Sequence, residues 1–299
     1  MISYRGFSKQ FGRQTAVADL TLEVEAGEVV ALLGTNGSGK TTSIKAAAGL
    51  VRPTSGEVLI GQPSRAALGA HARRACAFLP QRVAFPDQLT GREVVQFYCA
   101  LRGQDRTRAR EALAAASLNG AGDRPVATYS GGMVQRLGLA VALAARAPIL
   151  LLDEPTAALD PDGLCAFYGL IEQRRGAGHT VLFSSHKMGD VERLADRFAV
   201  LVGGRLVATL TGRELAARLA DRGVMKIAVD RHPPGLLAAI RQRSPRAVVA
   251  GDRIIVPGPA SERPAILDLV RQAGVEIRGL TAEEGRLDAF YRELVGAPR

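Results

Sequence analysis

The stretch Gly34-Thr35-Asn36-Gly37-Ser38-Gly39-Lys40-Thr41-Thr42 decides the fold of this chain. It fits the pattern G-x-x-x-x-G-K-[ST], in which the backbone N–H groups of a glycine-rich loop surround the phosphates of a nucleotide. An apolar run at 29–33 leads into the loop, and a helix-like run at 41–50 comes after it. Because strand, loop and helix occur in this order, the stretch predicts a phosphate site at a helix N-terminus rather than an ordinary Gly-rich turn.

Two side chains of this loop carry specific expectations. Lys40 is expected to reach the β- and γ-phosphates of the nucleotide, and the hydroxyl of Thr41 is expected to hold Mg²⁺. The glycines let the backbone approach the anion closely, and the helix N-terminus adds positive potential. Such a loop also occurs in kinases, GTPases and motors, so the rest of the chain has to narrow the function.

A second apolar run, residues 149–152, ends in the acids Asp153 and Glu154. Carboxylates directly after a buried strand are costly unless they are paired or bound to a metal. An Asp that reaches Mg²⁺ and an adjacent acid that activates water fit the hydrolysis of a nucleotide. Asp-Glu-Pro can also start a helix, but the phosphate loop already calls for a metal ligand, which favours hydrolysis.

Polar residues come after two further apolar runs. Gln81 lies beyond the run 75–79, and His186 lies beyond the run 180–183. If the sheet is parallel, these strand ends meet at the same edge as the phosphate loop. A lone His is more often structural than catalytic, so its place at this edge is what makes His186 a candidate.

Two other features could bind parts of a nucleotide. Ser130-Gly131-Gly132 precedes a helical run at 131–147, where Ser130 suits an N-cap and paired glycines beside a helix N-terminus can bind an anion. Such a triplet is common and is a weak signal by itself. Phe11 is expected in a polar loop and could stack on a nucleobase, although a lone Phe is equally well explained as part of the core.

The composition describes an ordinary globular chain. Of its 299 residues 47% are hydrophobic and 23% charged, and no apolar run reaches the roughly 20 residues that cross a bilayer. The N-terminus lacks the layout of a signal peptide, so the cytoplasm is the expected location. Cys76, Cys99 and Cys165 are too widely spaced for a C-x-x-C zinc or disulfide pattern. The net charge of +10 could attract nucleic acid or anionic lipid, but the basic residues are scattered, which favours a solvated basic surface.

Periodicity divides the chain into regions. Residues 3–33 are expected as strands, 89–147 as mainly helical, and 221–299 as a β-α-β-β-α-β module that resembles a split βαβ layer. The module includes an expected helix at 283–295 and carries no catalytic constellation. Thr90-Gly91-Arg92-Glu93 is typical of a capping box at the start of a helix.

Taken together, the motifs resemble those of the ATP-binding subunit of an ABC transporter. The family's order and spacing are matched over residues 3–220 by six motifs: the phosphate loop, Gln81, Ser130-Gly131-Gly132, Asp153-Glu154, Asp160 and His186. The resemblance implies an α/β fold, a P-loop NTPase core of the ABC ATPase type with an antiparallel β subdomain and a helical subdomain at about 86–147. The expected division is an ABC ATPase domain at 1–220 and a small α+β accessory domain at 221–299.

The resemblance implies how ATP and Mg²⁺ are held. Phe11 takes the place of the aromatic residue that stacks on adenine, and Lys40 binds the β- and γ-phosphates. Thr41 and Asp153 are the implied Mg²⁺ ligands. Gln81 is implied to sense the metal site and to pass its state to a membrane partner.

It also implies how catalysis and assembly are divided between residues. Glu154 is the implied general base for the attacking water, and His186 holds the γ-phosphate and that water. Ser130 and Gly132 would contact the ATP bound by a second copy of the chain, in a dimer that encloses two ATP molecules head to tail. Asp160 would lie at the interface of this homodimer.

Two departures from the family pattern stand beside the signature serine. Tyr129 replaces the usual leucine before it, and Met133 replaces the usual glutamine after the glycines. Neither removes the serine or the glycines, so the resemblance implies an active ATPase. It places the chain on the inner face of the cell membrane, where the helical region, above all 85–97, grips a transmembrane permease.

A narrower resemblance is local. Three stretches are similar to NosF-type ATPases of the NosDFY system, which matures the copper sites of nitrous oxide reductase: 91–93, 129–140 and 287–291. It implies a NosY-like permease, a periplasmic NosD-like protein and transport of a copper or sulfur species. One alternative is the ATPase of an exporter for drugs or other small molecules. An alternative from another class is a non-transport ABC ATPase that acts on nucleic acid or ribosomes, although the chain lacks the second cassette or coiled-coil insert typical of that class.

Overall fold

The computed structural model describes residues 1–61, 63–220 and 222–283. The chain divides into two compact units, Met1–Leu210 and Thr211–Arg299, and each is described by itself. The expected domain end at residue 220 lies further along the chain than this division, and the limit of an independently folding domain stays a prediction.

The first unit is built on a six-stranded sheet in the order β10-β9-β3-β8-β7-β6. Strands β9, β3, β8, β7 and β6 are paired in parallel, with Leu33 opposite Ser185 and Leu79 opposite Leu152. Their carboxyl ends therefore meet at one edge of the sheet, as expected. The six strands are β3 (Val29–Leu33), β6 (Cys76–Leu79), β7 (Ile149–Leu152), β8 (Thr180–Ser185), β9 (Arg197–Val202) and β10 (Arg205–Thr211).

A second, antiparallel sheet of four strands has the order β2-β1-β4-β5. Its strands are β1 (Ile2–Phe11), β2 (Gln14–Val24), β4 (Ser55–Ile60) and β5 (Arg65–Ala66). Phe11 was expected in a loop, but it is the last residue of β1 and pairs with Gln14. The strand extends this far because the tight turn at residues 12–13 starts directly after it, with Gly12 at φ 59°.

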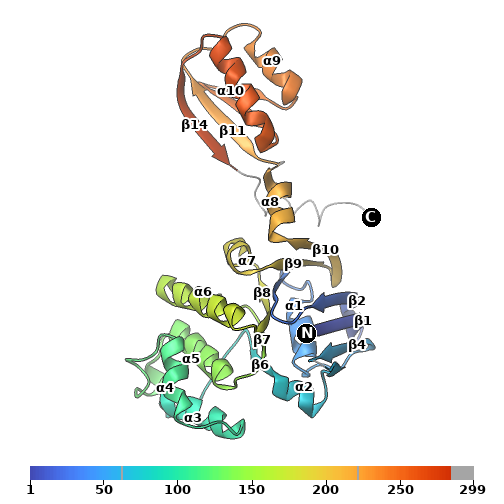
Figure 1. Ribbon diagram of the computed structural model, residues 1–299, viewed down its shortest axis with the longest axis vertical. Helices are drawn as coiled ribbons and strands as arrows, with labels where there is room; N and C mark the ends of the chain where they lie inside the picture. The colour runs from blue at the N-terminus through green and yellow to red at the C-terminus, as the bar shows by residue number, and fades with distance from the viewer. Residues whose placement is uncertain (62, 221, 284–299) are drawn as a thin grey trace. The chain divides into compact units, whose positions relative to one another are not determined.

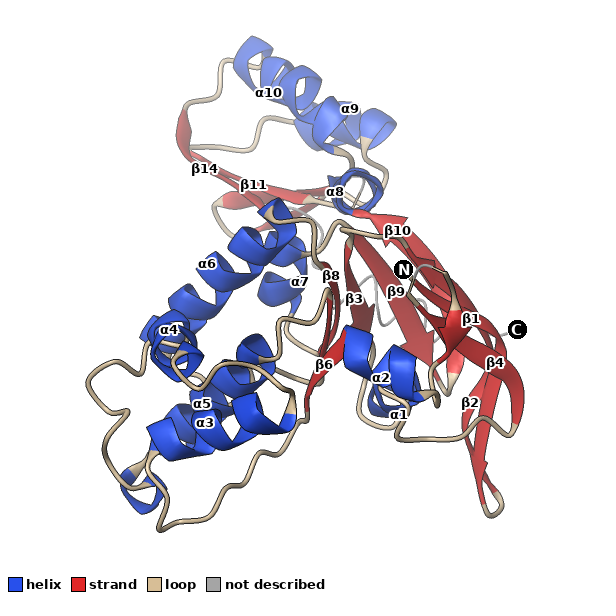
Figure 2. Cartoon of the chain, turned by 60° about the horizontal axis from the view of Figure 1, so that its bottom comes forward, coloured by secondary structure: helices blue, strands red, loops and turns tan. Residues whose placement is uncertain are grey.

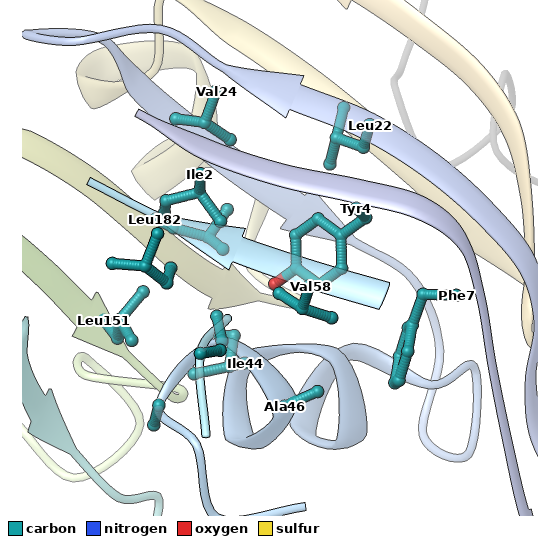
Figure 3. Packing of buried hydrophobic residues seen from close by; sticks show 14 of the residues in the cluster. Ile2, Tyr4, Phe7, Leu22, Val24, Ile44, Ala46, Val58, Leu151 and Leu182 are labelled. Carbon is teal, nitrogen blue, oxygen red and sulfur yellow. The ribbon is translucent and has the colours of Figure 1, made fainter. Parts of the chain in front are cut away.

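The main core lies where helix α1 (Lys40–Ala47) packs between the two sheets (Figure 3). Ile2, Tyr4 and Phe7 of β1 are fully buried, and Ile44 of α1 meets them in the same cluster. Each such side chain contributes about 1.5–3 kcal/mol through burial. Since the hydroxyl of Tyr4 donates to the carbonyl oxygen of Ser43 at 2.9 Å, no polar cost offsets this gain.

Three helices form a lobe with its own core, α3 (Gly91–Leu101), α4 (Arg108–Ala115) and α5 (Gly131–Ala144), drawn in green in Figure 1. The expected capping box is confirmed, because Thr90 and Glu93 satisfy each other's backbone N–H groups at the start of α3. The remaining helices of the first unit are α2 (Ala70–Ala75), α6 (Pro161–Gly176) and α7 (Met188–Leu194). Helix α7 was not predicted, since it is short and contains Gly189.

The second unit contains a four-stranded antiparallel sheet in the order β12-β13-β11-β14, with α9 and α10 over one face (Figure 2). This is the split βαβ arrangement expected from the sequence. Its elements are α8 (Gly212–Ala220), β11 (Val224–Val229), α9 (Leu236–Arg243), β12 (Val248–Ala250), β13 (Arg253–Pro257), α10 (Arg263–Gln272) and β14 (Ile277–Glu283). Glu283, expected to start a helix, ends β14, while residues 284–295 of that helix and the stretch 287–291 lie outside the described residues.

The described helices of the two units are too short or too polar to span a membrane. Within the described ranges 1–61, 63–220 and 222–283, none is both long enough and apolar enough to cross a bilayer.

Candidate nucleotide-binding site

The phosphate loop joins β3 to α1 and lines a pocket of about 510 Å³. Gly37 and Gly39 have φ values of 80° and 100°, a region that side chains rarely adopt. A Cβ on Gly39 would also lie 2.7 Å from the carbonyl oxygen of Ala16, so only glycine fits there. The pocket is lined by Phe11, Gln14, Ala16, Thr35, Asn36, Gly37, Ser38, Gly39, Lys40, Thr41, Thr42, Gln81 and Glu154.

Lys40 is buried at the base of this pocket. Its ammonium group donates to the carbonyl oxygens of Gly34 at 2.6 Å and Thr35 at 3.2 Å. It also lies 3.5 Å from Oε1 of Glu154, and both side chains are only 5% exposed. A buried cation held mainly by loop carbonyls can exchange these partners for phosphate oxygens, which form stronger, charge-assisted hydrogen bonds.

Asp153 is fully buried at the end of β7. Its Oδ1 accepts hydrogen bonds from Ser184 at 2.7 Å and from Thr41 at 3.1 Å. Its Oδ2 has no hydrogen-bond partner among the described residues. Burial raises the pKa of this carboxyl, and the hydrogen bonds from Ser184 and Thr41 oppose the shift. A cation beside Oδ2 would relieve this cost, so the oxygen pair of Thr41 and Asp153 suits Mg²⁺.

Glu154, the next residue, has a strained conformation. Its φ of 49° lies in the left-handed region, which costs a non-glycine residue of order 1–3 kcal/mol. Its backbone N–H donates to Oγ of Ser184 at 2.8 Å, and its Oε2 lies 2.7 Å from Nδ1 of His186. In this conformation Oε1 of the carboxylate lies 3.5 Å from the ammonium group of Lys40, and Glu154 lines the pocket.

Ser184 was not singled out from the sequence. It fixes both acids at once, because its hydroxyl donates to Asp153 and accepts from the N–H of Glu154. The change from an apolar run to Ser184-Ser185 at the end of β8 was an available signal. Gln14 and Ala16, which also line the pocket, gave no signal in the sequence.

The two remaining pocket candidates come from different sheets. Gln81 comes after β6, and Phe11, a residue that is 52% exposed, ends β1. The ammonium group of Lys9 lies 4.9 Å from the centre of the Phe11 ring, a cation–π contact. An exposed aromatic face beside a phosphate loop is suited to stack on a base.

The signature residues are not part of this pocket wall. Ser130 caps α5 by accepting from the N–H of Met133 at 3.2 Å, and Gly131 faces open space. A Cβ on Gly132 would lie 2.9 Å from the carbonyl oxygen of Ala158, so this turn packs directly on the segment that ends at Asp160. Asp160 caps α6, accepting from the N–H of Gly163 at 2.8 Å.

Sheet, loop and paired acids together define a P-loop nucleotide-binding protein. The sequence profile of the family described as ABC transporter matches residues 17–157. The daunorubicin resistance ATP-binding protein DrrA3 of Streptomyces coeruleorubidus is 32% identical over 308 residues, which cover 100% of this chain and 96% of that protein. The chain belongs to the ABC transporter family, as one of its ATP-binding proteins, and it is an ATPase.

Two further comparisons agree with this placement. The linearmycin resistance ATP-binding protein LnrL of Bacillus subtilis is 31% identical over 245 residues, 81% of this chain and 79% of that protein. Among solved structures, the ATP-binding cassette MJ0796, a dimer bound to ADP and Pi in a post-hydrolysis state, aligns with a TM-score of 0.66 at 28% identity. That alignment covers 71% of this chain and 99% of that chain, and it confirms the expected ABC ATPase fold.

Proposed function

We propose that this chain is the ATPase of an exporter for drug-like small molecules, and that it drives a separate transmembrane permease. The similarity to DrrA3, which extends over the whole chain and therefore through the second unit, carries the proposal. LnrL supports it, since that protein's name also joins ATP binding to resistance against a small molecule. The location implied by this role is the cytoplasmic face of the membrane.

In the proposed complex, ATP occupies the pocket with its phosphates in the loop 34–39 and its adenine on Phe11. Lys40 exchanges its carbonyl partners for phosphate oxygens. Thr41, Asp153 and Gln81 would hold Mg²⁺, which fits Oδ2 of Asp153, an oxygen that has no partner in the part of the chain that the structure describes. Bound there, Mg²⁺ would offset the negative charge of the phosphates.

Hydrolysis in this proposal needs Glu154 and His186. Water attacks the γ-phosphorus, the bond to the leaving oxygen of ADP breaks, and the Oε2 side of Glu154 takes the proton of the water. His186, whose Nδ1 lies 2.7 Å from Glu154, holds the water and the γ-phosphate in line. Lys40 stabilises the charge on the transferred group.

Two copies would complete each site. Ser130, Gly131 and Gly132 form an exposed helix N-terminus away from the pocket of their own chain, so their N–H groups are available to the γ-phosphate held by a second copy. Asp160 would lie beside them at the interface, because the segment before it packs on Gly132. The dimer of MJ0796 with ADP and Pi supports this assembly for a related cassette.

The permease would contact an aromatic surface of the helical lobe. Phe97 and Leu101 of α3 are 56% and 66% exposed, and the ring of Tyr98 meets those of Phe85 and Phe97 edge to face at 6.1 and 5.4 Å. Large exposed apolar side chains gathered on one helix are typical of a protein interface. The surface adjoins Gln81 along the chain, which would connect the pocket to the permease.

Replacing Phe97 and Leu101 together by alanine is expected to remove drug efflux while the purified subunit still hydrolyses ATP. Both side chains are exposed, so their loss leaves the lobe core intact. Daunorubicin transport into inverted vesicles that contain the natural permease measures the first property, and phosphate release by the purified chain measures the second. Unchanged transport would contradict the docking surface. Val248→Ala with Val249→Ala, an exposed pair in the second unit, serves as the control.

A strain that carries Glu154→Gln is expected to accumulate more daunorubicin or linearmycin than the wild type and to stop growing at several-fold lower concentrations. Cell-associated drug and growth inhibition measure this. Equal accumulation and growth for both compounds would contradict the exporter proposal.

The same strain tests the NosF-type assignment, which no relative named above supports. Loss of copper from nitrous oxide reductase in the variant, with unchanged drug sensitivity, would favour a NosY-like permease and a NosD-like partner instead. The nucleic-acid alternative predicts salt-dependent binding of RNA or DNA by the purified chain.

A further inference from the structure

Asp190 of α7 is a buried carboxylate that the proposed mechanism does not use. It is 2% exposed, and it accepts hydrogen bonds from three hydroxyl groups. Tyr168 of α6 donates to Oδ1 at 2.6 Å, while Ser185 at the end of β8 donates to Oδ2 at 3.2 Å. Thr156, in the loop after β7, also donates to Oδ2. A buried carboxylate is tolerated only with such partners, so these four side chains form one hydrogen-bond network, the Asp190 network.

Two cations flank the Asp190 network. The ammonium group of Lys187 donates to the carbonyl oxygen of Thr156 at 3.1 Å, and its backbone N–H donates to Oγ of Ser185 at 2.9 Å. The guanidinium of Arg193 lies 4.6 Å from the centre of the Tyr168 ring. Burial and the hydrogen bond to Asp190 raise the pKa of Tyr168 to about 12, so its hydroxyl remains a donor at neutral pH.

The Asp190 network joins the two segments that carry the proposed catalytic residues, Glu154 and His186. Thr156 lies two residues after Glu154, and Ser185 immediately precedes His186. Glu154 and His186 follow the neighbouring parallel strands β7 and β8, and Oε2 of Glu154 lies 2.7 Å from Nδ1 of His186. His186 has a largely exposed side chain, 53%, so packing around the ring does little to fix it. Instead, the segment after Glu154 and the residue before His186 are both hydrogen-bonded to Asp190, through Thr156 and Ser185.

We propose that Asp190 is a positioning residue for ATP hydrolysis. Its carboxylate holds the segment 154–156 and the loop 185–187 at the separation at which Glu154 and His186 face the same water. This inference rests on the roles proposed above for those two residues. A shift of about 1 Å in a reacting group can lower a rate by about 100-fold, so a tie of this kind would act on kcat. The pocket itself contains none of the four side chains, so ATP affinity is expected to stay the same.

Thr156 offers a matched pair of variants. Thr156→Val keeps the shape of the side chain but leaves Asp190 without one of its donors, whereas Thr156→Ser keeps the hydroxyl. The expected result is a kcat about 10- to 100-fold lower for Thr156→Val, with an unchanged KM for ATP, and substantial recovery in Thr156→Ser. Asp190→Asn is expected to behave like Thr156→Val, because an amide replaces one acceptor oxygen by a donor.

The experiment measures kcat, KM and circular dichroism of the full chain for these variants and for Tyr168→Phe and Glu154→Gln. If Thr156→Val, Asp190→Asn and Tyr168→Phe stay folded and keep the wild-type kcat while Glu154→Gln is inactive, the positioning role is wrong and the proposed catalysis stands. If Glu154→Gln hydrolyses ATP normally, the proposed catalysis itself is wrong. Unfolding of all three network variants, or loss of ATP affinity at unchanged kcat, would make the network structural and would also overturn the inference.

Discussion

Replacing Glu154 by glutamine is expected to lower kcat for ATP hydrolysis by about 10²–10⁴-fold while ATP still binds. Glutamine keeps the size of the side chain, but it cannot accept the proton of the attacking water. The buried ammonium of Lys40, 3.5 Å away, also loses an opposing charge and becomes more available to phosphate. Phosphate release under saturating ATP gives kcat, and a fluorescent ATP analogue gives the affinity.

The control for this prediction is Glu57→Gln. Glu57 lies on β4 with a side chain that is 52% exposed and paired with Arg5, so its charge is solvated and remote from the pocket. Its loss should leave kcat unchanged. A Glu154→Gln protein that hydrolyses ATP at the wild-type rate would contradict the assignment of the general base.

Replacing Lys40 by alanine is expected to weaken ATP binding by roughly 10- to 100-fold, because a hydrogen bond to a charged group contributes about 1.5–3 kcal/mol. Turnover at low ATP should fall with it. The backbone N–H groups of the loop remain, so residual binding is expected rather than none. Isothermal titration with ATP and Mg²⁺ measures the loss.

Lys226→Ala is the matched control for that variant. Lys226 lies on β11 in the second unit. Its side chain is partly exposed, and its ammonium group lies 2.8 Å from Oε1 of Glu283. This substitution also removes one lysine, so any general effect of charge on ATP binding appears in both proteins. Equal ATP affinity for Lys40→Ala and the wild type would show that the loop does not hold the phosphates.

The layout of the first unit could be predicted because its strongest signals are local. Runs of apolar residues such as 29–33 and 149–152 are long enough to identify buried strands, and the glycine loop predicts the turn and the helix after β3. Helix α7 escaped prediction because helix-breaking and helix-forming residues are mixed within seven positions. Phe11 was misplaced because the pairing that extends β1 to that residue depends on a partner strand, which a local pattern does not contain.

The site residues also divide into those that the sequence could predict and those that it could not. The phosphate loop and the two acids were predictable from spacing, since each is one continuous motif. The tie of Ser184 to Asp153 and Glu154 was not, because it depends on the parallel register of β7 and β8, residues about thirty positions apart in sequence. Asp190 is a stronger case: its three donors come from three separate elements, and no one stretch of sequence contains the set.

The substrate class depends on a different kind of information. The stretches 91–93 and 129–140 suggested a NosF-type ATPase, but the first lies in the capping box of α3 and the second mostly in the helix of the signature motif. Both stretches belong to the ATPase machinery, so they say little about which substrate is transported. Similarity over the whole length, including the second unit, is the better guide, and it favours a resistance exporter.

In the proposed dimer, one chain holds only half of each ATP site. The direct test is the mass of Glu154→Gln in solution, by light scattering, with and without ATP and Mg²⁺. We expect one chain without nucleotide and two chains with two ATP molecules bound. The second variant adds Gly131→Glu. The new side chain meets open space in its own chain, but it puts a negative charge where the γ-phosphate held by the second copy would lie. This protein should keep the mass of one chain while ATP still binds.

Gly169→Glu is the matched control, since that glycine also faces open space, on α6, and its variant should dimerise normally. A Glu154→Gln protein that binds ATP and keeps the mass of one chain would contradict the shared site, and so would a dimer that forms equally well with Gly131→Glu.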